Sequence, residues 1–161
     1  MAEIDDYASG RILTHIKRAL FLLRWVRIPI VGPFVRRALI AGIAPFAPRV
    51  VDNLEAAALI RAATTCAVGA RVCYALHPES VYTESIFLDG LADGMVGAGN
   101  ARHVTQKEAI DTLHAYSKGR PIIVANVSGK PREISSSSRK SCVAWNMERN
   151  GLKCVIGELE K

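Results

Sequence analysis

The 161-residue chain lacks acidic residues over a long stretch: no Asp or Glu occurs between Tyr7 and Val51. That stretch holds eight of the 21 Lys and Arg residues, whereas residues 52–161 hold thirteen basic and twelve acidic residues. The net charge of +6 therefore belongs to one segment, and the remainder of the chain is close to neutral. A one-sided basic segment favours a negatively charged partner surface.

Cysteine is scarce, and the start of the chain does not have the pattern of an export signal. MAEIDDYASG is polar and acidic, whereas a signal begins basic and continues apolar. Four cysteines are too few for a disulfide scaffold in a chain of this size. We therefore expect reduced thiols and a cytoplasmic protein. Half of the residues are apolar, which excludes a disordered tail and predicts a substantial core.

Long hydrophobic runs are also missing from the basic segment. A membrane span needs about 20 mostly apolar residues, and the longest charge-free run, residues 38–48, contains Gly and Pro. Apolar residues recur there at helical spacing instead. Because Pro29 and Pro33 interrupt the pattern, we predict two helices, at 11–27 and 34–43.

The first of these helices has apolar residues around most of its circumference. Ile12, Ile16, Leu20 and Leu23 form one stripe, and further large apolar residues, Phe21, Leu22 and Trp25, lie on the opposite side among the arginines. We therefore expect another surface to cover the apolar sides of this helix. An anionic membrane surface fits, with arginines at the headgroups and leucines below. The body of the chain, a neighbouring subunit or a larger complex fits as well.

Nucleic acid fits this segment less well, because the arginines alternate with large aliphatic residues and no binding motif is present. We therefore predict docking on a membrane or on a larger protein complex. The predicted docking residues are Arg11, Lys17, Arg18, Arg24, Trp25, Arg27, Arg36 and Arg37.

The predicted fold class is α+β, mostly helical with a small sheet. Residues 1–49 are the basic amphipathic helical segment, and residues 50–161 form a small α+β domain. Further helices are expected from Asn53 to about Thr64, from Ser80 through SIFLDGLADGM, in the capped segment after Thr105, and in RKSCVAWNMERN. Strands are expected in CAVGARVCYAL, PIIVANV and LKCVIGEL, with SGKPRE as a turn and residues 135–138 as a polar loop.

The four cysteines form two widely spaced pairs, Cys66 with Cys73 and Cys142 with Cys154. Neither pair has the close spacing of a preorganised metal site. In a strand, a separation of seven residues directs Cys66 and Cys73 to opposite faces unless the strand bends, which Gly69 would allow. Four thiolates suffice for one iron–sulfur cluster. Spacing alone favours the alternative, in which the cysteines are buried core residues.

Two stretches resemble cysteine-rich, ferredoxin-like iron–sulfur proteins of anaerobic microbes. VVDNLEAAALIRAATTCAVGARVC is similar to a segment in which a helix leads into a strand that ends in closely spaced cysteines with an arginine. GNARHVTQKEAIDTLHAYSKG resembles the downstream segment, where a Gly-Xaa-Ala-Arg turn leads into a Ser/Thr-capped helix. The resemblance covers about residues 50–155. It implies a protein that transfers electrons or accompanies a redox enzyme.

Two functional hypotheses follow from the resemblance. In the first, a redox-associated accessory protein carries one [4Fe-4S] cluster on Cys66, Cys73, Cys142 and Cys154. The family pattern has more cysteines, including a tight cluster near the C-terminus, and this chain has only two there. In the second hypothesis the clusters have therefore been lost, and a non-enzymatic subunit docks on a membrane surface or a larger complex. The sequence names no catalytic residue.

Overall fold

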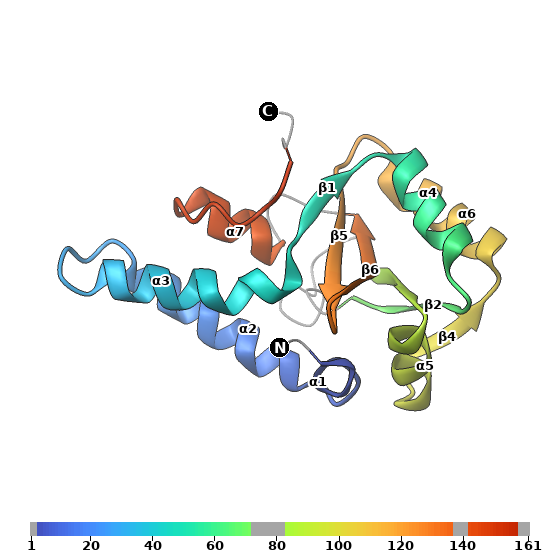
Figure 1. Ribbon diagram of the computed structural model, residues 1–161, viewed down its shortest axis with the longest axis horizontal. Helices are drawn as coiled ribbons and strands as arrows, with labels where there is room; N and C mark the ends of the chain where they lie inside the picture. Colours follow the sequence, from blue (N-terminus) through green and yellow to red (C-terminus); the bar gives the residue numbers. More distant parts are fainter. Residues whose placement is uncertain (1–2, 72–82, 137–141, 158–161) are drawn as a thin grey trace.

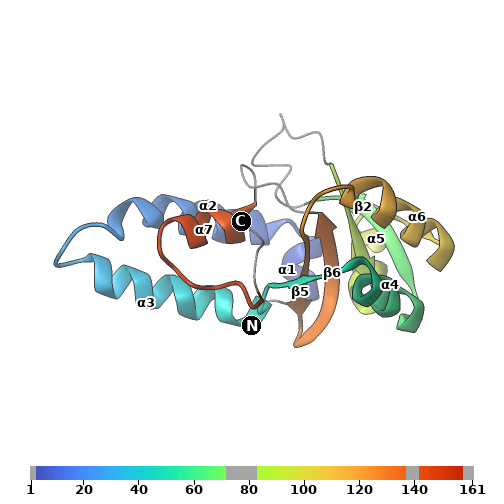
Figure 2. The ribbon, with the colours of Figure 1, turned by 90° about the horizontal axis from the view of Figure 1, so that it is seen from above.

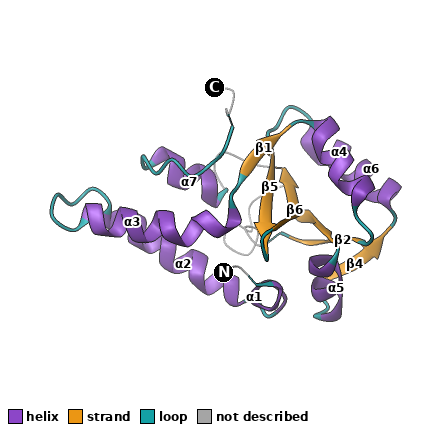
Figure 3. Cartoon of the chain, in the orientation of Figure 1, coloured by secondary structure: helices purple, strands orange, loops and turns teal. Residues whose placement is uncertain are grey.

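The computed structural model describes residues 3–71, 83–136 and 142–157. An antiparallel sheet lies at its centre, with helices on both faces (Figures 1 and 3). The strand order is β1-β5-β6-β3-β2-β4, and every neighbouring pair is antiparallel. This architecture confirms the predicted α+β class. The strands are β1 (Arg49–Val51), β2 (Cys66–Ala70), β3 (Glu84–Leu88), β4 (Ala101–Val104), β5 (Ile122–Val127) and β6 (Lys130–Ser136).

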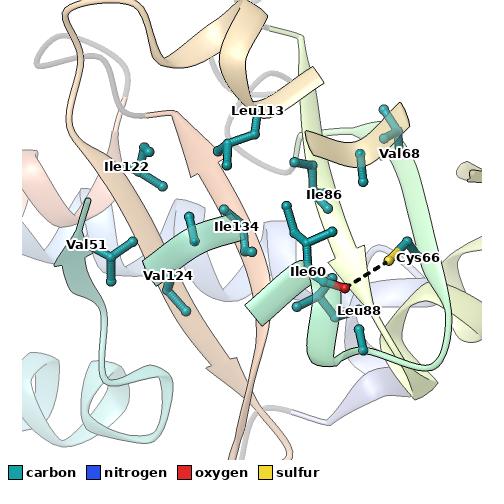
Figure 4. Close-up of a cluster of buried hydrophobic side chains, with 13 residues drawn as sticks. Val51, Ile60, Cys66, Val68, Ile86, Leu88, Leu113, Ile122, Val124 and Ile134 are labelled. Carbon is teal, nitrogen blue, oxygen red and sulfur yellow. Dashed lines mark hydrogen bonds between the residues drawn. The ribbon is translucent and has the colours of Figure 1, made fainter. Parts of the chain in front are cut away.

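Helices α4 (Asn53–Ala62) and α6 (Gln106–Ser117) cover one face of the sheet (Figure 1). Strand alternation directs Ile86 and Leu88 into the core beneath these helices, and Phe87 to the other face. Figure 4 shows this core, which includes Ile60 of α4 and Leu113 of α6. Both helices begin at a side-chain cap, as the sequence predicts, although Asp52 caps α4 in place of the expected Asn53.

Helices α1 (Ile4–Ala8) and α5 (Gly90–Gly97) pack on the opposite face. Tyr7 of α1, Phe87 of β3 and Leu91 of α5 are buried together in a second apolar cluster. The cluster also includes Ile12, so the N-terminal segment shares a core with the sheet.

The two predicted N-terminal helices are present. Helix α2 (Arg11–Leu22) continues into a short 3-10 turn, η1 (Leu23–Trp25), and after a loop comes α3 (Gly32–Ile43), followed by η2 (Ala44–Phe46). Figures 1 and 2 show α2 and α3 side by side as a hairpin that projects away from the sheet, with α7 (Val143–Arg149) beside it. Among the described residues, no helix has the length and apolar character that crossing a bilayer requires.

One predicted helix is wrong. The stretch SIFLDGLADGM divides into the strand β3 and the shorter helix α5, because its first residues pair with both β2 and β6 in the middle of the sheet. Asp89 separates the two elements with a positive φ of 52°. Its backbone N–H donates to the carbonyl of Thr65 at 2.8 Å, and its carboxylate accepts from the N–H of Thr64. The expected helix start at Ser80 lies outside the described residues.

Two further expectations need correction. SGKPRE is not only a turn: Ser128 and Gly129 turn the chain, and β6 begins at Lys130 and includes Ser135 and Ser136 of the expected polar loop. The predicted closing strand in LKCVIGEL is reduced to a single parallel bridge between Ile156 and Arg49 within the described part of the chain. The remaining residues, 158–161, are not described.

Candidate functional site

Exposed apolar side chains gather on the helical hairpin. Eight of the ten large apolar residues that are exposed in the described structure lie between residues 21 and 40. Within this group of eight, the highest exposures are at the tip and the start of α3, where Ile30 is 82 % exposed and Phe34 is 72 % exposed. The eight are Phe21, Leu22, Trp25, Ile28, Ile30, Val31, Phe34 and Ile40. Single exposed apolar residues are ordinary, whereas a contiguous group marks an interaction surface.

Basic residues alternate with this apolar group along the hairpin sequence. All eight predicted docking residues are exposed, which leaves each of them accessible to a partner. Arg11 pairs with Asp6 at 3.1 Å, and Arg36 donates to the carbonyl of Gly151. Arg24 and Arg27 flank Trp25 near the tip, in a segment whose sequence contains no carboxylate. We call the exposed apolar group together with these basic residues the hairpin surface.

Local sequence shapes the tip. Pro33 occupies the first turn of α3, where a missing N–H costs nothing. The N–H of Gly32 donates to the carbonyl of Ile28 at 2.7 Å. A Cβ atom at Gly32 would overlap the carbonyl of Val26, so glycine allows the close approach that folds the tip back.

The opposite side of the hairpin packs on the rest of the protein. Leu23 and Leu39 are buried against Met147 and Leu152, and Ile16 and Leu20 are partly buried. The stripe that begins at Ile12 is therefore covered by the chain itself. The residues on the other side of α2 remain exposed, so the protein's own body accounts for only one of the two apolar sides.

The three described cysteines lie on different faces of the sheet. Cys66 is buried in the core beneath α4 and α6, with its Sγ 3.9 Å from the carbonyl oxygen of Ile60 (Figure 4). Burial raises the pKa of its thiol, and the nearby carboxylate of Asp89 raises it further. Cys73 lies outside the described residues.

Cys142 and Cys154 lie on the opposite face, beside α7. The pKa of Cys154 is raised to about 12 by burial, by the Glu148 carboxylate and by Cys142. Cys66 is separated from this pair by the sheet. In the described ranges no group of three His, Cys, Asp or Glu side chains is arranged to hold a metal. Within the described structure, Cys66 therefore lies apart from Cys142 and Cys154.

A buried polar cluster lies on the hairpin side of the sheet. The Glu133 carboxylate accepts hydrogen bonds from the Tyr7 hydroxyl at 2.9 Å and the Ser85 hydroxyl at 3.3 Å. Burial raises the pKa of Glu133, and these hydroxyls and the nearby Arg71 partly oppose that shift. Sequence reasoning missed this cluster, because Tyr7 and Glu133 are 126 positions apart and neither belongs to a motif.

Comparison with known proteins leaves the family open. No protein-family model matches the chain, and searches of curated proteins and of solved structures gave no significant match.

Proposed function

We propose that the protein is a non-enzymatic accessory protein that docks on an anionic membrane surface through its hairpin surface. The concentration of exposed apolar residues at the hairpin tip, interleaved with arginines, carries this proposal. The described residues outside the hairpin have only two exposed large apolar residues, Leu54 and Ile156.

Charge and hydrophobicity act together in such binding. Each basic residue near an anionic leaflet contributes about 1 kcal/mol, and each buried CH₂ group contributes about 0.8 kcal/mol. Trp25 suits the headgroup boundary, because its ring is apolar and its N–H is polar. Ile30 and Phe34 would lie below that boundary, within the roughly 5–10 Å that interfacial helices reach.

A membrane is favoured over a protein partner by the shape of the surface. Exposed apolar residues and arginines alternate around the end of a projecting hairpin, which would bring both to the boundary between acyl chains and headgroups (Figure 2). Arg11 pairs with Asp6, whereas Arg24 and Arg27 lie in a stretch of sequence without acidic residues, so the charge of these two is available to anionic lipids.

Vesicle co-sedimentation tests the proposal. We expect the protein to pellet with vesicles that contain phosphatidylcholine and phosphatidylglycerol, and to stay in the supernatant with phosphatidylcholine alone. Ile30→Ser with Phe34→Ser should remove the apolar anchor, and Arg24→Gln with Arg27→Gln should weaken binding about thirtyfold, because two charges are lost at about 1 kcal/mol each. Added salt should weaken binding in the same direction.

Two control variants are matched to these changes. Leu54→Ser removes an apolar side chain that is 79 % exposed on α4, and Lys107→Gln with Lys118→Gln removes two exposed charges near α6. Both should bind vesicles like the unaltered protein. If the unaltered protein stays in the supernatant with both lipid mixtures, the proposal fails, and the hairpin surface is then a contact for another protein.

The redox role implied by the resemblance stays a prediction. It is tested by measuring iron and acid-labile sulfide, with a visible spectrum, on protein purified without oxygen. About four irons and four sulfides per chain would support a cluster. A colourless, metal-free and folded protein would leave the cysteines as core residues.

A further inference from the structure

Helix α1 is a short, five-residue helix that connects the hairpin to the body of the protein. It lies between α2 and α5 and contacts both of them (Figure 1). Its Ile4 packs on two glycines of α5, Gly90 and Gly94, and a Cβ atom at Gly94 would lie only 2.6 Å from Cγ2 of Ile4. Helix α2 begins at Arg11, soon after α1 ends at Ala8. The position of α1 therefore fixes the base of the hairpin.

Two hydrogen bonds between this segment and the body of the protein differ in burial. Near the surface, the side-chain amide of Asn100 donates to the carbonyl of Ala8 at 2.9 Å. In the interior, the Tyr7 hydroxyl donates to the Glu133 carboxylate at 2.9 Å, and these two residues are 5 % and 9 % exposed. The docked position of α1 therefore covers a carboxyl group, and burying a carboxyl is far more costly when it is charged.

The surroundings of Glu133 act on its charge in opposite directions. Burial favours the protonated form and raises the pKa of Glu133, whereas the hydroxyls of Tyr7 and Ser85 and the nearby guanidinium of Arg71 favour the carboxylate and partly oppose that shift. Arg71 itself donates to a backbone carbonyl of β6. The other charged or titratable groups that line the space beside Glu133 come from α1, α2 and the start of α7, and they are Asp6, His15, Arg18 and Cys142.

We infer that α1 is a latch controlled by the proton of Glu133: the protonated carboxyl keeps α1 on the sheet, and loss of the proton makes α1 detach locally and frees the base of the hairpin. Detachment removes the Tyr7 ring and lets water reach the carboxylate, which relieves the cost of burying its charge. The core beneath α4 and α6 contains no residue of α1, so the sheet can stay folded while α1 opens.

The latch does not rest on membrane docking. It concerns the side of the protein on which α1 packs, and it is measured in solution without lipid. Vesicle binding by a protein whose α1 does not respond to pH would leave the docking proposal standing and remove the latch. A pH-dependent α1 in a protein that does not bind vesicles would do the reverse.

Hydrogen–deuterium exchange of the full chain, at a series of pH values, tests the inference. The amides of Ser9 and Gly10 report on α1, because they donate to the carbonyls of Asp5 and Tyr7 at 2.9 and 3.1 Å. Protection factors correct for the ordinary pH dependence of amide exchange. We expect the protection of these amides to fall by up to about tenfold per pH unit above the ordinary Glu pKa of about 4.3, because opening then releases one proton. It should level off once Glu133 is ionised in the folded protein as well.

Strand β5 provides the internal reference in the same experiment. Its amides lie in the middle of the sheet and exchange through larger openings, so we expect them to be better protected than the α1 amides at every pH. Equal protection of the two segments would mean that α1 opens only when the whole protein unfolds. That result, or α1 protection that does not change with pH, would overturn the latch.

Two variants assign the effect to Glu133. Glu133→Gln keeps the shape of the side chain and removes its titration, so α1 protection should become independent of pH. Asn100→Ala is the matched control: it removes a hydrogen bond to α1 without removing a titrating group, so protection should fall by the same factor at every pH. A pH dependence that persists in Glu133→Gln would overturn the assignment to this residue. The profile of the unaltered protein still tests the latch if Glu133→Gln does not fold.

Discussion

Two regions of the protein differ in where their apolar residues lie. One region is the sheet with the helices α4 and α6, and the other is the helical hairpin. The core beneath α4 and α6 buries thirteen residues, whereas in the hairpin helices a few residues, such as Leu23 and Leu39, are buried and many large ones are exposed. Apolar content alone therefore does not locate the core of this protein. In the sheet region the apolar residues form a core, whereas in the hairpin many of them lie on the surface.

The largest expected contrast compares two phenylalanines. Phe87→Ala should lower the free energy of unfolding by about 3–5 kcal/mol, because Phe87 is fully buried and its loss leaves a cavity. Phe34→Ala should change it by less than about 0.5 kcal/mol, because the ring is 72 % exposed. Urea denaturation measures both. A similar loss in the two variants would show that the hairpin tip is packed rather than exposed.

Two glycines sharpen the contrast within the hairpin. Gly32→Ala should cost about 1–3 kcal/mol, because its Cβ would overlap the Val26 carbonyl and force the tip to shift. Gly42→Ala has open space and should stabilise α3 by up to about 1 kcal/mol through helix propensity. Chemical denaturation of the two variants gives the comparison. Equal effects of the same sign would contradict the tight turn at Gly32.

The buried carboxyl of Glu133 predicts a pH dependence of stability. Because its pKa is raised, the folded protein binds this proton more tightly than the unfolded chain. Its contribution is complete below the ordinary Glu pKa of about 4.3 and is lost as the pH rises through the raised value. Glu133→Gln should remove this decline, so that the variant gains stability relative to the unaltered protein as the pH increases.

Urea denaturation of both proteins at a series of pH values between acid and neutral measures that difference. Other titrating groups are common to the two proteins and cancel to first order. A difference that stays constant over the series would contradict a raised pKa at Glu133.

The smallest effect concerns thiol reactivity. The raised pKa values of Cys66 and Cys154, the latter about 12, keep both as thiols, and the thiolate is the reactive form. Iodoacetamide should therefore label these two far more slowly in the folded protein than in guanidinium. Peptide mapping by mass spectrometry gives the rates. Fast labelling of Cys154 in the folded protein would point to a more open α7 region.

Local patterns were sufficient where an element makes its own interactions. The stripe from Ile12 to Leu23 repeats every three or four residues, and Thr105 caps its helix through a neighbour three positions away. PIIVANV is β-branched enough to predict β5. Each of these patterns lies within one helix or one strand, so it can be recognised from the sequence alone.

Local patterns predicted the wrong secondary structure where pairing within the sheet determines it. ESIFL is an apolar run that is too short for its periodicity to distinguish a helix from a strand. Its pairing with β2 and β6 selects the strand. Pro131 has no backbone N–H to donate to a neighbouring strand, which favours a turn in SGKPRE over a strand. It is tolerated because the part of β6 that pairs with β3 begins only at Glu133, so this end of the strand has one partner.

The sequence by itself determined the charge asymmetry, the two N-terminal helices and the α+β class, because these depend on composition and short-range periodicity. Only the tertiary structure decided which apolar residues are covered, that Cys66 and Cys154 lie on opposite faces, and that Tyr7, Arg71 and Glu133 line one cavity. The physical reason is that burial and polar contacts arise between distant segments, and their positions follow from the strand order rather than from spacing along the chain.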